Sequence, residues 1–224
     1  HCKPVALLIR KKTFSKYNLI NQNNLLQFDL MSREAVLKLL LNEIPDDTII
    51  VSTTGKTSRE IFEIRDKIDG NHSRDFLTVG SMGHGSSIAL GIAISNPNIK
   101  VVCIDGDGAL LMHLGSLSTI SKLKPNNFYH ILINNEVHES VGGQETSIKY
   151  LNIKKLVESH NYNKVFLEKS KKKIISSFND FFNFKGPNFL EIKVKPGSRD
   201  DLGRPSVKPI DNKVSIMNFI KKIK

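Results

Sequence analysis

Cysteine is scarce in this sequence. Cys2 and Cys103 are the two cysteines among 224 residues, and neither stands in a Cys-x-x-Cys pair. The spacing therefore indicates neither a redox-active pair nor a disulfide framework. Because Cys103 falls in an apolar run that we expect to be a buried strand, we interpret both as reduced structural thiols of a cytoplasmic protein.

Long apolar runs are missing as well. No run approaches the roughly 18 residues of a membrane-spanning helix, so we expect no membrane span. The opening residues, HCKPVALLIRKK, have a basic cluster after a short apolar run, contrary to a secretory signal peptide. The chain begins with His, and we expect it to be a fragment or a processed piece. We find no internal repeat and no long low-complexity segment.

Acidic residues are outnumbered by basic ones. There are 33 Lys and Arg against 22 Asp and Glu, a formal charge of +11. Such an excess is found in proteins that bind nucleic acid or anionic substrates. Many of the lysines gather at 169–173 and at the C-terminus, without the interleaved aromatic residues used for base stacking. We interpret them as a solvated surface; a noncatalytic module that binds a nucleotide or nucleic acid is the alternative from another functional class.

Two polar signals each follow an apolar run. Gly-Asp-Gly at 106–108 follows the run at 101–104, and Asn134-Asn135 follows the run at 128–133. From 107 to 135 is 28 positions, about the length that two parallel strands and a crossover helix require. We expect that helix from Ala109 to about Lys124. Both signals then lie at the carboxyl ends of strands, where open α/β sheets bind ligands.

The residue types of this pair suit a metal and an anion. Asp107 offers a carboxylate and Asn135 an amide oxygen, which are ligands that Mg²⁺ prefers. The glycines beside Asp107 allow a ligand to approach the backbone closely, and the first N–H groups of the expected helix favour an anion. The pair therefore predicts a bound diphosphate. The simpler interpretation is a tight strand-to-helix turn and an asparagine-containing loop.

The spacing of these motifs resembles the thiamine-diphosphate (ThDP)-dependent decarboxylases. Within that family, four segments are similar to the phosphonopyruvate decarboxylases. They are STTGKTSRE at 52–60, GSMGHGSSIALGIA at 80–93, NNEVHESVGGQ at 134–144 and LGRPS at 202–206. The resemblance extends from about Pro4 over nearly the whole chain. It implies ThDP and Mg²⁺ as cofactors, with Mg²⁺ held by Asp107, Asn135 and the backbone carbonyl of Val137. The implied cofactor-binding residues are Gly80, Ser81, Met82, Gly106, Asp107, Gly108, Ala109 and Asn135.

The resemblance also implies a division of the chain. Residues 1–28 would be the end of a preceding pyrimidine-binding domain, with a strand at Val5–Ile9 and a polar linker, and residues 29–224 the diphosphate-binding domain. The family's activating Glu lies in the pyrimidine-binding domain, so no residue of this chain takes that role. We therefore expect a pyrimidine-binding domain or subunit as a partner and a homo- or hetero-oligomer, with neither nucleic acid nor a membrane as a partner.

Strands alternate with helices along the rest of the chain. This order predicts an α/β fold, a doubly wound parallel sheet with helices on both faces. Ser32 and Asn152 are expected N-caps of helices that reach Ile44 and about His160, and Ser58 is expected to cap a helix from Arg59 to about Ile68. Further strands are expected at 48–51, 163–167 and 189–194, and further helices after 85, at 170–184 and at 216–223.

Several residues are candidates for catalysis or substrate binding. His84, His113 and His138 follow the segments that the resemblance assigns to the cofactor, and could bind anionic groups or transfer a proton; a lone His is more often structural. Glu139 is a weaker candidate of the same kind, and Asp105 is expected to be structural. Arg199 and Arg204 could bind a phosphonate, although a flexible basic tail is the favoured interpretation.

The segment at 52–60 admits two interpretations. Its Gly-Lys-Thr lacks the upstream glycine of a phosphate-binding Walker loop, because residue 50 is Ile. The segment is then a hydroxyl-rich capping turn or, by resemblance, a loop that faces the substrate with Thr53 and Thr54. The resemblance implies decarboxylation of a small anionic 2-keto acid, 3-phosphonopyruvate, to phosphonoacetaldehyde and CO₂, as in phosphonate biosynthesis. A sulfopyruvate decarboxylase subunit or another ThDP-dependent 2-keto acid decarboxylase is the nearest alternative.

Overall fold

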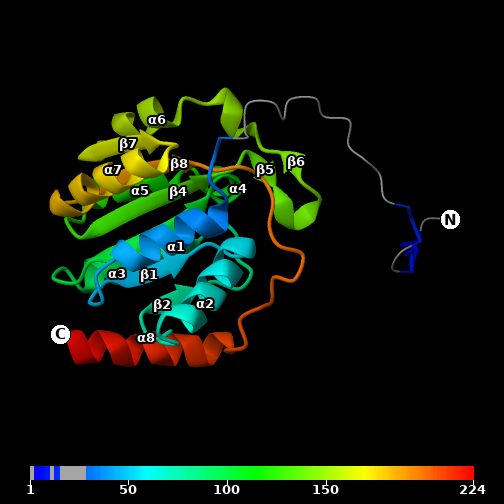
Figure 1. Ribbon diagram of the computed structural model, residues 1–224, viewed down its shortest axis with the longest axis horizontal. Helices are drawn as coiled ribbons and strands as arrows, with labels where there is room; N and C mark the ends of the chain where they lie inside the picture. Colours follow the sequence, from blue (N-terminus) through cyan, green and yellow to red (C-terminus); the bar gives the residue numbers. More distant parts are fainter. Residues whose placement is uncertain (1–2, 11–12, 16–28) are drawn as a thin grey trace.

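The computed structural model describes residues 3–10, 13–15 and 29–224 (Figure 1). Cys2 and most of the expected linker, residues 16–28, lie outside the described residues. The expected strand at Val5–Ile9 is wrong: these residues are outside any helix or strand, and Leu8 is 94% exposed. An extended segment needs a neighbouring strand to pair its backbone groups, and none of the described strands lies beside it.

A single six-stranded parallel sheet forms the centre of the domain. Its strand order is β2-β1-β3-β4-β8-β7, and every neighbouring pair is parallel. The doubly wound fold predicted from the sequence is thus confirmed, with β3 and β4 adjacent as the 28-residue spacing requires. In sheet order the strands are β2 (Asp75–Leu77), β1 (Ile49–Ser52), β3 (Val101–Gly106), β4 (Phe128–Asn134), β8 (Asn188–Lys193) and β7 (Lys164–Glu168).

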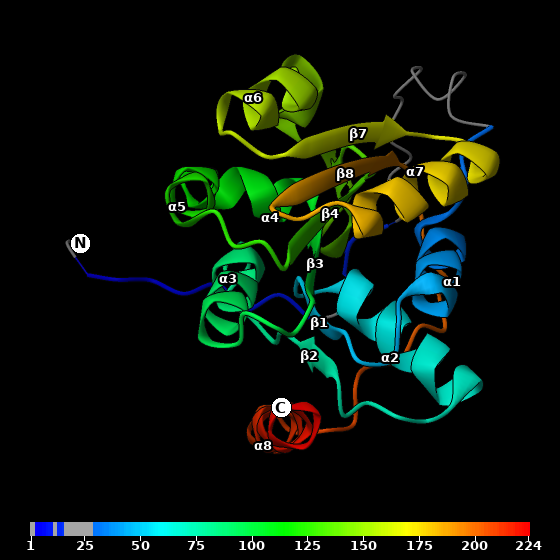
Figure 2. The ribbon, with the colours of Figure 1, turned by 90° about the vertical axis from the view of Figure 1, so that its left-hand side faces the viewer.

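Helices cover both faces of this sheet, as Figure 2 shows. One face packs against α1 (Arg33–Glu43), α2 (Lys56–Ile68) and α7 (Lys171–Asn183). The other packs against α3 (Gly85–Ser95), α4 (Asp107–Met112), α5 (Ser116–Leu123) and α6 (Ile153–Ser159). With both faces covered, the central strands are apolar along nearly their whole length, which is why their sequence runs lack a polar alternation.

The last helix, α8 (Pro209–Ile223), lies along the β2 edge of the sheet. Its Asn212 side chain donates to the backbone carbonyl of Asp75 (2.7 Å) and accepts from the backbone N–H of Leu77 (3.2 Å). The expected start at Ile216 is therefore too late. The helix begins two turns earlier because Pro209 fits a first helical turn, where its missing N–H costs nothing.

The helix expected from Ala109 to Lys124 is two helices, not one. α4 ends at Met112, and α5 begins at Ser116 after a break at residues 113–115. At this break the backbone of Gly83 approaches so closely that a Cβ there would lie 2.5 Å from the His113 ring. The neighbouring loop and the weak helix former Gly115 explain the break, and the approach of that loop cannot be read from the helical pattern.

The helix caps were predicted with mixed success. Ser32 accepts from the N–H of Ala35, and Asn152 accepts from the N–H of Lys155, so both predicted N-caps are confirmed. Ser58 is not an N-cap, because α2 already begins at Lys56. Its hydroxyl instead donates from the first turn of α2 to the backbone carbonyl of Thr53 (2.6 Å), in the loop before the helix.

A buried ion pair joins α2 to the edge strand. Arg65 donates to Asp75 with Nε and Oδ2 2.8 Å apart, and both side chains are buried. Burial raises the pKa of Asp75 above its usual value, and Arg65 opposes that shift.

Within the described part of the chain, no helix is long and apolar enough to cross a membrane.

Candidate functional site

A pocket of about 250 Å³ opens at the carboxyl ends of β1, β3 and β4. It is the edge of the sheet at which ligands bind in folds of this kind. Three segments supply most of its wall, one after each strand. The lining residues are Arg33, Thr53, Thr54, Gly55, Lys56, Thr57, Arg59, Met82, Gly106, Asp107, Gly108, Ala109, Ile133, Asn135, Val137, His138, Glu139, Ser140 and Val141.

Asp107 stands at the point where β3 turns into α4. Its side chain is buried and accepts a hydrogen bond from the Thr146 hydroxyl (2.7 Å). Burial raises the pKa of Asp107, and the hydrogen bonds from Thr146 and the backbone N–H of Gly108 only partly oppose this. A buried carboxylate of this kind fits a bound cation, which would offset the cost of burying its charge.

The two asparagines after β4 have different surroundings. Asn135 lines the pocket, and its Oδ1 also accepts from the backbone N–H of Val137 (3.2 Å). Asn134 does not line it; its amide donates to Glu191 (2.7 Å) in the sheet. Glu136 adopts a left-handed backbone conformation, which makes the turn between β4 and the next strand. Asn135 and Val137 therefore share the pocket with Asp107, as their predicted role as metal ligands requires.

The segment after that turn forms a small hairpin that the sequence did not predict. Strand β5 (Val137–His138) pairs antiparallel with β6 (Gln144–Glu145) around a short 3-10 turn. A second 3-10 turn, Ser147–Tyr150, leads into α6. Two-residue strands are too short for their alternation to be recognised in a sequence.

His138 and Met82 meet at Gly108. A Cβ on Gly108 would lie 2.7 Å from the His138 ring and 3.1 Å from the end of the Met82 side chain. A side chain at 108 would therefore displace the His138 ring or the end of the Met82 side chain, which occupy the space above Gly108. Of the three predicted histidines, the structure brings His138 to the pocket.

The other two histidines lie together outside the pocket. The rings of His84 and His113 are 4.0 Å apart between centroids, beside the backbone of Gly83. Gly80 and Ser81 also do not line the pocket; the N–H of Gly80 donates to the Thr54 hydroxyl (3.0 Å), which does. The catalytic and cofactor roles assigned to these four residues remain predictions.

Three basic side chains in the pocket wall were not predicted as site residues. Arg33 makes two hydrogen bonds to Glu60 (2.7 and 2.8 Å) and one to Glu139 (2.6 Å), and it is buried. Lys56 and Arg59 lie on the first turn of α2 and are half-buried. The sequence does carry a signal for these two residues, because Lys and Arg three positions apart share a face of the helix that follows a strand. Arg33 had none, since its partners lie far from it in the sequence.

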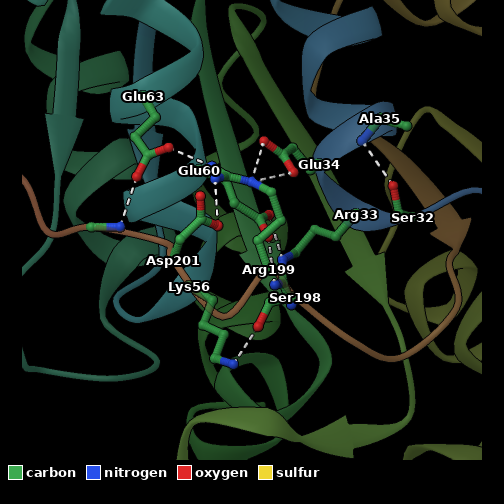
Figure 3. A network of polar contacts seen from close by, with 11 residues as sticks. Ser32, Arg33, Glu34, Ala35, Lys56, Glu60, Glu63, Ser198, Arg199 and Asp201 are labelled. Carbon is green, nitrogen blue, oxygen red and sulfur yellow. Dashed lines mark hydrogen bonds and ion pairs between the residues drawn. The ribbon is translucent and has the colours of Figure 1, made fainter.

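The segment from Gly197 to Gly203, here called the strap, lies across α1 and α2 (Figure 3). Arg199 pairs with Glu34 (3.0 Å), Asp201 (2.8 Å) and Glu63, and Glu63 also accepts from the N–H of Gly203 (2.7 Å). The interpretation as a flexible basic tail is therefore wrong for this segment. Its basic residue Arg199 is held by carboxylates from helices that are distant in the sequence.

The strap also reaches the pocket wall. The Ser198 hydroxyl accepts from the Lys56 ammonium group, and the Gly197 N–H donates to Glu139 (Figure 3 shows the Lys56–Ser198 contact). Arg199 is committed to carboxylates and does not line the pocket, and neither does Arg204, which is exposed. The structure does not bring either arginine to the site as a phosphonate ligand.

The sequence of this chain is similar to a known family model and to two kinds of decarboxylase. Residues 54–192 match the family model described as "Thiamine pyrophosphate enzyme, C-terminal TPP binding domain". A phosphonopyruvate decarboxylase of Streptomyces viridochromogenes is 37% identical over 180 residues, which are 80% of this chain and 44% of that protein. A sulfopyruvate decarboxylase subunit beta of Methanothermobacter thermautotrophicus is 33% identical over 185 residues, 80% of this chain and 89% of that protein.

A solved structure has the same fold. It is described as a putative thiamin diphosphate-dependent enzyme from Mycobacterium smegmatis, and it superposes with a TM-score of 0.63 at 22% identity. The match covers 75% of this chain and 32% of that one. This chain thus spans less than half the length of that enzyme and of the phosphonopyruvate decarboxylase.

Proposed function

The chain belongs to the thiamine pyrophosphate enzymes, by their C-terminal TPP-binding domain, and on that premise we propose that it is the diphosphate-binding half of a phosphonopyruvate decarboxylase. The reaction is the ThDP- and Mg²⁺-dependent conversion of 3-phosphonopyruvate to phosphonoacetaldehyde and CO₂. The observation that carries the proposal is the pocket that brings together Asp107, Asn135 and His138. The 37% identity to the Streptomyces phosphonopyruvate decarboxylase supports the choice of substrate.

The donor set at the ends of β3 and β4 supports Mg²⁺ as the metal. Asp107 and Asn135 would hold it through side-chain oxygens, and Val137 through its backbone carbonyl. A carboxylate, an amide oxygen and a carbonyl oxygen are the hard ligands that Mg²⁺ prefers, with ligand phosphates and water completing its shell. The backbone of residues 106–109 would contact the diphosphate, since Gly106 and Gly108 leave it accessible.

The protein's part in the reaction is to bind, orient and move protons. When bound, ThDP supplies the electron sink that the loss of CO₂ from a 2-keto acid requires. Met82 would support the cofactor from the loop before α3. His138, in the same pocket wall, is the residue that we propose to hold or transfer a proton, and His84 and His113 remain candidates further from the pocket.

The other half of the active site would come from a partner. We propose that residues 1–28 end a pyrimidine-binding domain and that 29–224 form the domain described above. The activating Glu would then lie on the pyrimidine-binding half, either fused or in a separate subunit. The buried, free Cys103 is consistent with the cytoplasmic location that we propose.

The second candidate is a subunit of a sulfopyruvate decarboxylase. The observation in its favour is that this chain covers 89% of the Methanothermobacter subunit, so a chain of this size exists as a separate subunit in that enzyme. A sulfonate has the shape of a phosphonate but carries one negative charge. Mass analysis of the native protein would show whether the pyrimidine-binding half is fused or separate.

Side-by-side assays distinguish these functions. The 224-residue chain is combined with its pyrimidine-binding half, ThDP and Mg²⁺, and given 3-phosphonopyruvate, sulfopyruvate or pyruvate. We expect kcat/KM for 3-phosphonopyruvate to exceed that for pyruvate by at least about tenfold. Equal values for pyruvate would discard the phosphonate specificity, and a preference for sulfopyruvate would favour the second candidate. A protein that binds no ThDP in the presence of Mg²⁺ would instead be a noncatalytic module.

A further inference from the structure

The pocket wall carries three basic side chains that the proposed Mg²⁺ site does not use. Arg33, Lys56 and Arg59 all line it. The charge of Arg33 is matched by two carboxylates, Glu60 and Glu139, at hydrogen-bond distance. Lys56 and Arg59 therefore remain as the basic groups that are available to an anionic ligand.

Neither Lys56 nor Arg59 pairs with a carboxylate in the described part of the chain. The Lys56 ammonium donates one hydrogen bond, to Ser198, and has two donors left. The Arg59 guanidinium has five N–H donors in a planar fork that suits the oxygens of a phosphonate. Half-buried cations without carboxylates are favourable only when an anion or water accepts from them.

Hydroxyl groups stand beside these two cations. Thr53, Thr57 and Ser140 line the same pocket, and the Oγ1 of Thr53 is buried without a hydrogen-bond partner among the described residues. An unpartnered buried hydroxyl costs free energy unless a ligand or water pairs with it. Cations and hydroxyls together form the kind of donor set that a tetrahedral oxyanion requires.

We propose that Lys56 and Arg59 bind the phosphonate group of the substrate and that Ser198 positions Lys56 for this role. The inference rests on the proposed function and names the side chains that give it specificity. The phosphonate is one carbon away from the keto group that reacts at the cofactor, so its ligands must lie in the wall of the pocket that holds the cofactor. Lys56 and Arg59 meet this condition, whereas Arg199 and Arg204 do not.

The three 2-keto acids differ in charge at the end of the molecule away from the carboxylate, and this difference predicts how strongly each variant weakens the binding of each substrate. A phosphonate carries up to two negative charges, a sulfonate one, and the methyl group of pyruvate none. Loss of either cation should therefore weaken the binding of 3-phosphonopyruvate most, that of sulfopyruvate less, and that of pyruvate least.

A binding experiment tests this without depending on turnover. The probe is 3-phosphonopropanoate, which keeps the carboxylate and phosphonate but lacks the keto group, and its Kd for the assembled protein with ThDP and Mg²⁺ is measured by calorimetry. We expect Lys56→Met and Arg59→Gln each to raise Kd by at least about tenfold, as for the loss of a charge-assisted hydrogen bond. Lys67→Met is the matched control, since Lys67 is exposed on the last turn of the same helix and should leave Kd unchanged.

Variants that keep the charge separate a loss of binding from a loss of folding. Lys56→Arg should keep Kd within a few-fold of the wild type. Ser198→Ala should raise KM for 3-phosphonopyruvate by a few-fold without changing kcat, and Ser198→Thr should restore it. Wild-type Kd values in Lys56→Met and Arg59→Gln, or a wild-type protein that does not bind the probe, would overturn the inference.

The outcomes separate this inference from the proposed function. If the protein binds the probe through Lys56 but decarboxylates none of the three 2-keto acids, the anion site stands and the proposed reaction fails. If the wild type decarboxylates 3-phosphonopyruvate while Lys56→Met loses as much kcat/KM on pyruvate as on 3-phosphonopyruvate, the reaction stands and the specificity role fails.

Discussion

At the scale of single residues, Gly108 is where three loops of the pocket meet. Gly108→Ala would place a methyl group 2.7 Å from the His138 ring, which must turn away, and 3.1 Å from Met82. We expect a loss of about 1–3 kcal/mol in the free energy of unfolding, as for other overpacked sites. Urea unfolding of the variant measures it.

The matched control is Gly91→Ala. Gly91 lies on the exposed side of α3, and a Cβ there would meet nothing within 4 Å. Because alanine is the better helix former, the free energy of unfolding of this variant should exceed that of the wild type by roughly 0.5–1 kcal/mol. Equal effects of the two substitutions would show that the packing at Gly108 does not restrict it.

The second prediction concerns Asp107. Asp107→Ala removes the carboxylate proposed to hold Mg²⁺, and we expect Mg²⁺-dependent ThDP affinity to fall at least about 100-fold, because even indirect partners of a metal contribute 10- to 100-fold. Val137→Ala keeps the backbone carbonyl and should change the affinity little. Calorimetric titration of ThDP into the assembled protein compares the two, and wild-type affinity in Asp107→Ala would refute the assignment.

Residue identity and spacing predicted where some of the candidate residues lie, while their roles stay predictions. Asp107 and Asn135 lie together at the pocket because they directly follow two strands whose spacing makes them neighbours, and His138 lines the pocket in the segment after Asn135. Lys56 and Arg59 were passed over, since the match to a nucleotide-binding loop was rejected and the interpretation as a substrate-facing loop was given to the hydroxyls of Thr53 and Thr54. Pairs such as Arg33 with Glu139 come from tertiary packing, which a linear pattern does not carry.

At the scale of elements, the pairing of α2 with the edge strand depends on a buried ion pair. Arg65→Met would leave the Asp75 carboxylate buried without its partner, and we expect a loss of about 3 kcal/mol in the free energy of unfolding. The double variant Arg65→Met/Asp75→Leu should recover most of that loss, because it removes both charges. Chemical denaturation of both variants tests the prediction, which fails if the double variant is no more stable than the single one.

The docking of the strap on α2 should depend on pH. The Gly203 N–H and the Arg199 guanidinium hold the pKa of the Glu63 carboxyl below its usual value of 4.5. A carboxyl with a lowered pKa in the folded state stabilises above its unfolded pKa, and that contribution disappears as the pH falls through the folded value. We therefore expect the strap to loosen below pH 4.5 and not at neutral pH, with the Gly203 amide shift as the NMR signal.

Glu63→Gln should loosen the strap already at neutral pH. The other charged groups around Glu63 are Arg199, Glu34 and Lys67, which keep their charge in this variant. Glu43→Gln makes the same change in charge at the exposed end of α1 and should leave the Gly203 signal unchanged. A strap that stays docked in Glu63→Gln would contradict the role given to this carboxylate.

The elements themselves were predicted most reliably where they are long and buried. β3, β4, β8 and α7 lie within one or two residues of their expected bounds because their apolar runs are continuous or strongly periodic. The break between α4 and α5 was missed, since it depends on the approach of the Gly83 loop. The hairpin of β5 and β6 was missed because its two-residue strands have no pattern of their own.

At the scale of the whole molecule, the pocket opens at one edge of the sheet and the strap ties that edge to the helices beside it. Residues from the first helix and the loop after β1 line this pocket, and the C-terminal segment holds two of the lining residues, Lys56 and Glu139, from outside, although the three segments are far apart in the sequence. A change in the strap should therefore affect substrate binding without touching the substrate.

The contact between Asn212 and β2 affects how readily the protein aggregates on heating. The edge of a sheet is a template on which another chain can add a strand, and here the amide of Asn212 occupies backbone groups of Asp75 and Leu77 that such a strand would need. Asn212→Ala should uncover these groups and make the protein aggregate at lower temperature than the wild type, as measured by light scattering. α8 then protects against intermolecular sheet growth, and its detachment rather than global unfolding would set the temperature at which aggregation begins.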